Sequence, residues 1–165
     1  MPTVMPALSC PIASRFIDTR EDALSYYAHK LAGDHAITVR GVALVVRFNV
    51  EEIHLFTDER SPCPPADVTA RAGASGEVRC FSRERARALD RILPILQAPA
   101  VAHDAKMQKG VKLFGPADPA ARRLCVIVAP GREAHVYFVR TAYDVSPKDF
   151  AAARGSGRAA PWPPK

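Results

Sequence analysis

Several features that would reveal a function class directly are absent from this chain of 165 residues. No apolar run approaches the roughly 20 residues that a helix needs to cross a bilayer, so we expect no membrane partner. No basic residue precedes Arg15 and prolines interrupt the first segment, which is unlike a secretory signal peptide. We therefore expect the protein to be cytoplasmic, or delivered to a target cell by a non-Sec route.

Cysteine is also too sparse to form a familiar metal or redox motif. The four cysteines are Cys10, Cys63, Cys80 and Cys125, and no two of them have the CxxC spacing. We expect buried free thiols, which suit a reducing cytoplasm. The five histidines are scattered and none has a second ligand at helical or hairpin spacing, so we predict no metal site.

The glycine and serine patterns argue against two further classes of enzyme. The nine glycines form neither a GxGxxG nor a GxxxxGK[ST] loop, so nucleotide triphosphate chemistry is not expected. No serine lies in a Gly-x-Ser-x-Gly turn, so acyl transfer is unsupported. We therefore expect no cofactor.

Positive charge is abundant and is concentrated in the second half of the chain. The net charge is +6, of which residues 1–82 contribute −2 and residues 83–165 contribute +8. A basic half of this kind suggests a polyanionic partner. Nucleic acid is favoured over a membrane surface because no strongly apolar amphipathic helix accompanies the charge.

The first half of the chain reads as a helix followed by strands. After an irregular segment over residues 1–13, Thr19 is typical of an N-cap, and the apolar spacing from Ala23 predicts a helix that ends near Gly33. Three further elements are predicted, namely a hairpin of strands 36–50 and 52–57, an exposed loop over 58–75 and a short strand over 77–81. We group residues 14–82 as an N-terminal unit.

The second half reads as a basic helix and an antiparallel sheet. Ser82 is typical of an N-cap, and the spacing predicts a helix over 83–96 with Arg83, Arg87 and Arg91 along one side. The elements expected next are an irregular strand or long turn over 101–115, a central strand over 123–129, a strand over 132–146 and a helix over 148–154 capped by Ser146. Residues 83–154 form the predicted core. Residues 155–165 have the composition of a flexible tail, in which Trp162 is a side chain able to dock on the body.

The predicted strand over residues 132–146 sorts polar from apolar side chains. Alternation places His135, Tyr137, Thr141 and Tyr143 on one face, and it places Val136, Phe138 and Ala142 on the other. Imidazole, phenol and hydroxyl groups in one row can bind and protonate a phosphate ester. The alternative is structural, because aromatic and β-branched residues are common on the solvated face of a sheet.

The side chains that remain form a metal-free set suited to RNA cleavage. His103 and His135 can take a proton from the 2′ hydroxyl and give one to the leaving 5′ oxygen. Lysine and arginine side chains can stabilise the negatively charged phosphorane. The run Lys106, Lys109 and Lys112 can equally serve solubility, so the pattern leaves both interpretations open.

A helix ending in the segment Ile92 to Pro99 is followed by a lysine-bearing segment through Phe114, an apolar strand, and a closing strand with the tripeptide Thr141-Ala-Tyr143. This order of elements over residues 81–146 resembles the barnase/EndoU/colicin/RelE superfamily, in particular its phage-borne and polymorphic-toxin branches. The resemblance implies a metal-independent ribonuclease, often a toxin. It also implies a site on Thr141, Tyr143 and His135, with a lysine from the run before the sheet.

These observations predict an α+β fold, with an antiparallel sheet of four or more strands, one basic helix packed on it, and an N-terminal helix and β-hairpin as an extension. The predicted function is a metal-independent endoribonuclease toxin or effector that cleaves RNA by 2′-OH attack. The predicted catalytic residues are His135, Thr141, Tyr143 and His103, and the predicted RNA-binding residues are Arg87, Arg91, Lys106, Lys109, Lys112 and Arg140. Besides RNA, we expect an acidic immunity protein or antitoxin as a partner.

Two other functions remain open. The first is a non-enzymatic nucleic-acid- or protein-binding module that keeps the sheet and the basic helix. The second is an NAD-using, ADP-ribosyltransferase-like effector, which is disfavoured because no glutamate follows Glu133. That scheme would need His54, a tyrosine and Glu77 or Glu133. The sequence leaves open whether His54 joins His135 in space.

Overall fold

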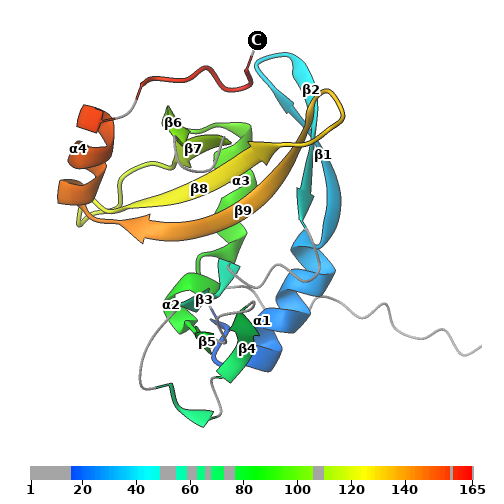
Figure 1. Cartoon of the computed structure of the whole chain (residues 1–165), viewed down its shortest axis with the longest axis vertical. Coiled ribbons are helices and arrows are strands. Elements are labelled where there is room, and N and C mark those ends of the chain that lie inside the picture. The colour runs from blue at the N-terminus through cyan, green and yellow to red at the C-terminus, as the bar shows by residue number, and fades with distance from the viewer. Residues whose placement is uncertain are drawn as a thin grey trace, which may run out of the picture.

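The chain folds around one large sheet and one small sheet (Figure 1). A computed structural model describes residues 16–48, 55–58, 63–65, 68–72, 77–105, 110–156 and 158–164. The helical elements are α1 (Arg20–Tyr26), the π-helical turn η2 (Tyr27–Leu31), α2 (Arg83–Ala86), the 3-10 turn η5 (Leu89–Arg91), α3 (Ile92–Gln97) and α4 (Pro147–Ser156). The strands are β1 (Gly33–Val39), β2 (Val42–Phe48), β3 (Thr57–Asp58), β4 (Val68–Ala72), β5 (Glu77–Phe81), β6 (Val101–Ala105), β7 (Gly110–Phe114), β8 (Arg123–Pro130) and β9 (Val136–Val145).

The large sheet has six strands in the order β1-β2-β9-β8-β7-β6, and the small sheet has the order β3-β5-β4. Neighbouring strands of the large sheet are antiparallel except β2 and β9, which run parallel. The predicted α+β class is confirmed. The sheet is mixed, however, rather than antiparallel as the sequence suggested.

The N-terminal hairpin is part of the large sheet and not an extension of it. The sequence predicted one strand over residues 36–50, but the chain turns back at Arg40 and Gly41, whose φ angles are 49° and 79°. Two consecutive residues with positive φ form the tight turn that suits the twist of a hairpin. Strand β2 then pairs with β9 from Val45 onward, which joins the hairpin to the centre of the sheet.

The main core lies between one face of the large sheet and α3, which runs behind it (Figure 1). Leu113, Val126 and Val139 on the sheet belong to the same buried cluster as Ile92 and Leu96 of α3. Burying a side chain of this size contributes about 2 kcal/mol. The opposite face has a smaller cluster that packs against α4 through Phe150. Strand β8 is buried along both faces, so its predicted central position is confirmed.

The predicted helix over residues 83–96 is broken into α2, η5 and α3. Ser82 caps α2 through the backbone N–H of Arg85, as its sequence position predicts. A single helix would bring the Pro94 ring against the carbonyl of Asp90 and lose one hydrogen bond. Because α3 begins only at Ile92, Pro94 lies in its first turn, where no N–H is needed.

A β-bulge in β9 changes which side chains share a face. Ile127 of β8 pairs with Thr141, but Val128 pairs with Val139, so Arg140 is the extra residue. Before the bulge, Tyr137 and Val139 belong to the main core, whereas beyond it Tyr143 packs with the smaller cluster on the opposite face. The predicted single row from residue 135 to residue 143 is therefore wrong.

The C-terminal residues follow the sheet instead of forming a free linker. Helix α4 extends to Ser156, and its predicted cap by Ser146 is confirmed. The chain then runs beside β6, where Asp104 donates its backbone N–H to the carbonyl of Arg158 at 2.9 Å. Trp162 is 2% exposed and donates its indole N–H to the Leu96 carbonyl at 2.7 Å. The tail thus adds an indole ring to the main core.

A disulfide joins Cys63 to Cys80 of β5. The prediction of free thiols is wrong for this pair and holds for Cys125, which is free and buried; Cys10 lies outside the described residues. Disulfides persist mainly in oxidising compartments, so the thiol argument for a cytoplasmic protein no longer applies.

Among the described residues, no helix is long and apolar enough to cross a membrane.

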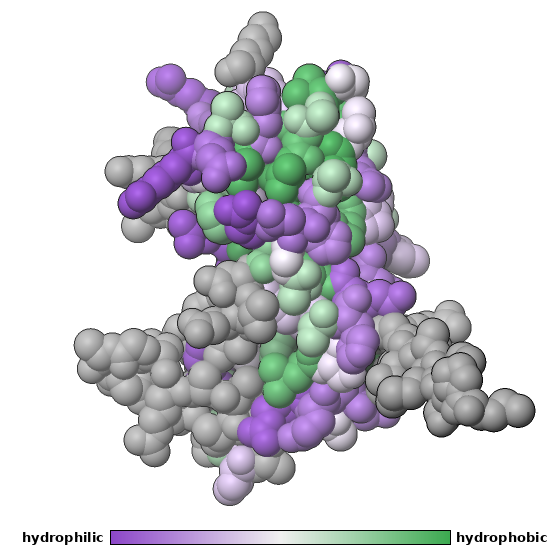
Figure 2. Space-filling view, turned by 90° about the vertical axis from the view of Figure 1, so that its right-hand side faces the viewer, coloured by the Kyte–Doolittle hydropathy of each residue, from purple (hydrophilic) through white to green (hydrophobic). Residues whose placement is uncertain are grey.

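The side of the molecule that carries β1 and α1 has a mixed surface. Figure 2 shows hydrophobic residues gathered in its upper half, bordered by hydrophilic ones. Among the described residues, the exposed large hydrophobic side chains are Phe16 and Leu24, which lie just before α1 and within it.

Candidate functional site

The guanidinium of Arg85 joins α2 to the open edge of β9. Strand β9 pairs with β2 over Val136–Phe138, and beyond Phe138 its edge faces α2. Arg85 donates from Nε and Nη2 to the Ala142 carbonyl, at 3.1 and 2.6 Å, and from Nη2 to the Thr141 hydroxyl at 2.9 Å. These bonds replace the strand partner that the edge lacks.

A second set of bonds connects Arg85 to the small sheet. Its Nη1 donates to the Thr57 carbonyl of β3, and the buried Arg79 of β5 donates to the same carbonyl at 3.0 Å and to the Thr57 hydroxyl at 2.8 Å. Burial lowers the pKa of the Arg85 guanidinium, and the charge of Arg79 lowers it further, whereas Asp58 and Tyr143 act in the opposite direction. Arg85 is therefore a partly desolvated cation whose hydrogen bonds go to two carbonyls and a hydroxyl.

A pocket of about 310 Å³ opens beside Arg85, between α2, η5 and β9. We call it the arginine pocket, and its charged and phenolic lining residues are Asp58, Glu84, Arg85, Arg91, Arg122, Tyr143 and Asp144. Arg122 donates to the Asp144 carboxylate at 3.0 Å, which raises the pKa of the Arg122 guanidinium. Arg91 is exposed and has no ion pair with another described residue. Arg91, like Arg85, is thus a lining cation that a ligand can neutralise.

Tyr143 keeps its proton at neutral pH. Burial, together with the contact to the Cys125 thiol, raises the pKa of Tyr143 to about 12. Burial likewise raises the pKa of Cys125 to about 11, although its contact with Tyr143 and the charge of Lys112 act against this. The phenol in this pocket can therefore donate a hydrogen bond or a proton, and it is not a base at neutral pH.

Two of the predicted site residues, Tyr143 and Arg91, line the arginine pocket. Thr141 lies at its border, because its hydroxyl accepts a hydrogen bond from Arg85. The structure thus brings together part of the predicted set on α2, η5 and β9.

His135 lies elsewhere. The predicted strand begins only at Val136, and His135 ends the preceding turn with a φ of 62°. Its carbonyl accepts from the Val45 N–H at 2.9 Å. His135 and Tyr143 are separated by most of β9, which corresponds to roughly 25 Å of extended chain. The pair cannot act on one phosphate.

His103 and Lys112 face each other across β6 and β7, outside the arginine pocket. The predicted irregular segment is in fact a hairpin of these strands. The His103 ring is 6% exposed and packs edge-on against Phe114, with ring centroids 6.1 Å apart. Its Nδ1 has no hydrogen-bond partner among the described residues. These contacts are those of a packed histidine.

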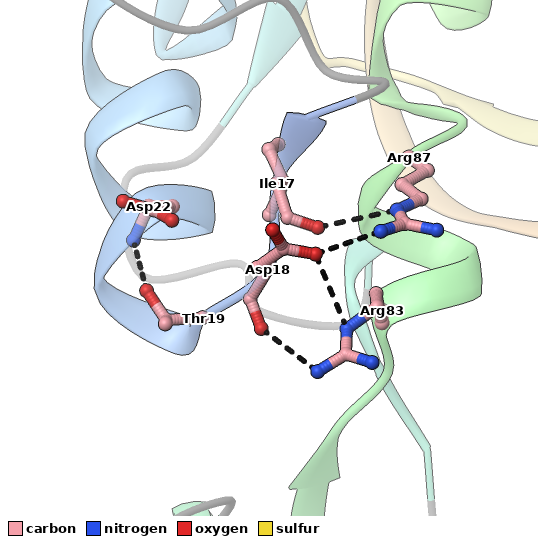
Figure 3. Close-up of polar contacts among 6 residues, drawn as sticks. All are labelled: Ile17, Asp18, Thr19, Asp22, Arg83 and Arg87. Atoms are coloured by element: carbon pink, nitrogen blue, oxygen red, sulfur yellow. Dashed lines mark hydrogen bonds and ion pairs between the residues drawn. The ribbon is translucent and has the colours of Figure 1, made fainter.

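The basic stripe of the helix binds the protein itself (Figure 3). Arg87 donates to the Asp18 carboxylate at 2.7 Å and to the Ile17 carbonyl at 3.3 Å, and Arg83 donates to the Asp18 carbonyl at 3.3 Å. These bonds hold the segment that precedes α1. The N-cap of α1 is Thr19. Two of the three arginines are thus engaged within the fold.

The other predicted residues are scattered or undescribed. Arg140 lines a different groove at the β8–β9 turn. Lys106, Lys109 and His54 lie outside the described residues.

Sequence reasoning missed Arg85, Glu84 and Arg122. Arg85 lies off the Arg83–Arg87–Arg91 spacing, so it did not join the basic stripe. Its one local signal is its position between Ser82 and the buried Ala86, which places it beside the core-facing side of α2.

Within the described part of the chain, no cluster of three or more His, Cys, Asp or Glu side chains could hold a metal ion. No family model, no curated protein and no solved structure matches this chain.

Proposed function

We propose that this protein binds RNA at the arginine pocket and cleaves its backbone without a metal ion. The observation that carries the proposal is a set of three groups on one 310 Å³ pocket: the desolvated cation Arg85, the unpaired cation Arg91 and the protonated phenol Tyr143. Their chemistries match what a phosphodiester needs at its charged oxygens and at its leaving group.

The arginines supply the phosphate contacts. Four hydrogen bonds from Arg85 go to protein acceptors, and a guanidinium has five N–H groups, so one N–H and the charge remain for a ligand. Arg91 adds an exposed guanidinium, which can bind two phosphate oxygens at once. The Arg122–Asp144 pair forms a neutral side of the pocket.

Glu84 and Tyr143 supply the proton transfers. The Glu84 carboxylate takes the proton of the 2′ hydroxyl as its oxygen attacks phosphorus. The bond from phosphorus to the 5′ oxygen then breaks, and that oxygen receives the Tyr143 proton. The products are a 2′,3′-cyclic phosphate and a 5′ hydroxyl, and the phenolate regains its proton from Glu84 through water. An alkoxide is a stronger base than a phenolate, so this donation is favourable even with the raised pKa of Tyr143.

The lack of a histidine among the described lining residues favours one alternative, an RNA-binding module that does not cleave. His135 and His103 both lie outside the arginine pocket. Such a module would use the same arginines, so only the integrity of the bound RNA separates the two functions.

An acidic immunity protein or antitoxin belongs to the same proposal. Residues 83–165 carry a net charge of +8 and include Arg85, Arg91 and Tyr143. A partner with the opposite charge would cover the pocket and block cleavage. Co-expression with the neighbouring reading frames, followed by purification, tests whether an acidic protein accompanies this chain and inhibits it.

The experiment that tests the proposal is incubation of purified protein with a labelled RNA oligonucleotide in EDTA. We expect cleavage of RNA, a 2′,3′-cyclic phosphate end, and no cleavage of DNA of the same sequence, which lacks the attacking hydroxyl. RNA that remains intact but bound would establish the module instead. RNA fragments that end in a 3′ phosphate, formed without a 2′,3′-cyclic phosphate intermediate, would contradict the 2′-OH mechanism.

A further inference from the structure

A second groove lies at the turn between β8 and β9. Its volume is about 430 Å³, and the residues that matter here are Arg47, Gly131, Arg132, Glu133, Phe138 and Arg140. We call it the Phe138 groove. No described residue lines both this groove and the arginine pocket. Phe138 alternates along β9 with the core residues Tyr137 and Val139, so the groove opens on the face of the sheet away from the main core.

One wall of the Phe138 groove is a cation held over an aromatic ring. The Arg47 guanidinium lies 5.6 Å from the centroid of Phe138, its neighbour across β2 and β9. Asp34 of β1 fixes it by two bonds, from Nε at 2.6 Å and from Nη2 at 2.9 Å. A guanidinium that is hydrogen-bonded at two nitrogens and packed on a ring presents a flat charged surface.

Gly131 lets the Phe138 ring lie against the turn. A Cβ at position 131 would come within 2.9 Å of Phe138 Cε2 and 3.1 Å of the Val136 carbonyl oxygen. That carbonyl already accepts from the Gly131 N–H at 2.8 Å, so the backbone cannot move away without losing the bond. The conformation of the turn therefore fixes the position of the Phe138 ring.

Two exposed arginines complete the groove. Arg132 and Arg140 form no ion pair with another described residue. Arg140 is the bulged residue of β9, and a bulge redirects its side chain relative to the regular strand. Among the described residues that line the groove, the carboxylate is Glu133. With Arg47 neutralised by Asp34, the excess charge of the groove is positive.

We propose that the Phe138 groove binds one nucleotide of a single-stranded RNA, with the base on the Arg47 guanidinium and the phosphate on Arg132 and Arg140. Bases stack on guanidinium planes and aromatic rings whatever their identity, and arginines bind the phosphates. An acidic peptide would use the two free arginines but would gain nothing from the flat surface. The inference rests on the proposed function for the choice of RNA as ligand.

Binding of a 2′-O-methyl RNA of about ten nucleotides, followed by fluorescence anisotropy at low salt, tests the inference. This probe cannot be cleaved, so its binding is read whether or not the protein cuts RNA. We expect the double variant Arg132→Ala/Arg140→Ala to bind about tenfold more weakly. The matched control Arg20→Ala/Arg158→Ala removes the same charge elsewhere and should change binding far less.

Asp34→Ala separates stacking from simple charge. Removing this carboxylate makes the surface more positive, so charge alone predicts tighter binding. The proposed site predicts weaker binding, by about threefold to tenfold, because Arg47 loses its support and the stacking surface with it. The variant Gly131→Ala, which displaces the ring, should act in the same direction.

The outcomes distinguish this inference from the proposed function. Loss of binding in the groove variants, with unmodified RNA left intact by the parent protein, supports the groove and contradicts cleavage. If the parent protein cleaves RNA but the parent protein and the groove variants bind the probe equally, the groove is overturned and the proposed function stands. Three other results would also overturn the groove. These are failure of the parent protein to bind the probe, tighter binding of the probe by Asp34→Ala, and competition by a poly-glutamate peptide that is as strong as competition by unlabelled RNA.

Discussion

The backbone carbonyl of Ala142 accepts two hydrogen bonds from the guanidinium of Arg85, one from Nε at 3.1 Å and one from Nη2 at 2.6 Å. Through this contact, α2 closes the edge of β9 that β2 leaves open. The same guanidinium reaches the small sheet at Thr57. One side chain therefore connects the two sheets to α2, and it also forms a wall of the arginine pocket.

Replacement of Arg85 by lysine should destabilise the fold although the charge is kept. A lysine ammonium cannot reach the Thr57 carbonyl, the Thr141 hydroxyl and the Ala142 carbonyl together. The Thr57 carbonyl keeps its bond from Arg79, but leaving the Ala142 carbonyl or the Thr141 hydroxyl unpaired should lower the free energy of unfolding by about 3 kcal/mol. Urea denaturation measures this, with Arg91→Lys as the control, since Arg91 is exposed. Equal stability of both variants would contradict the structural role of Arg85.

His135 should tolerate glycine and resist valine. Its φ of 62° lies in the left-handed region, which costs a β-branched residue about 1–2 kcal/mol and a glycine almost nothing. We expect His135→Gly to be at least as stable as the parent protein and His135→Val to unfold at lower urea concentration. Because its side chain lies far from Tyr143, His135→Gly should also keep RNA cleavage. Loss of cleavage with stability intact would restore His135 as the proton-transfer residue.

The elements that the sequence predicted correctly are those marked by local signals. Thr19 and Ser146 cap their helices where expected, and the apolar run of β8 is the buried central strand. A cap depends on the three or four residues that follow it, and an apolar run reports burial directly.

The errors arise where distant residues decide the outcome. The bulge at Arg140 reverses the alternation along β9, and no residue type marks it in the sequence. The parallel pairing of β2 with β9 and the Cys63–Cys80 bond also depend on tertiary contacts. The predicted single row of polar side chains is wrong for the same reason, since one extra residue separates the faces on which Tyr137 and Tyr143 lie.

The Cys63–Cys80 disulfide should stabilise the small sheet and, through it, the arginine pocket. Cys80 follows Arg79, which shares the Thr57 carbonyl with Arg85. Closing a loop of 17 residues contributes about 3 kcal/mol. We expect Cys63→Ala/Cys80→Ala to unfold at lower urea concentration, and a reductant to bring the parent protein to the same midpoint. The double variant itself should not respond to reductant; a parent protein that does not respond either would argue against the bond.

Stability should fall in alkaline solution partly because of Tyr143. Its folded pKa of about 12 lies above the value of about 10 expected in the unfolded chain. Between these values the native state keeps a proton that the unfolded state has lost, so the free energy of unfolding falls as pH rises from 10 to 12. Tyr143→Phe should flatten this part of the stability profile, measured by urea denaturation at each pH. An unchanged profile would mean that Tyr143 titrates normally.

The most direct test of the central claim compares kcat/KM for RNA cleavage in EDTA among the parent protein, Glu84→Gln, Tyr143→Phe and a surface control, Arg20→Ala. If the arginine pocket carries out the reaction, the first two variants should each lose about 100-fold or more while remaining folded, and the control should match the parent protein. Cleavage that survives in both Glu84→Gln and Tyr143→Phe would contradict the account.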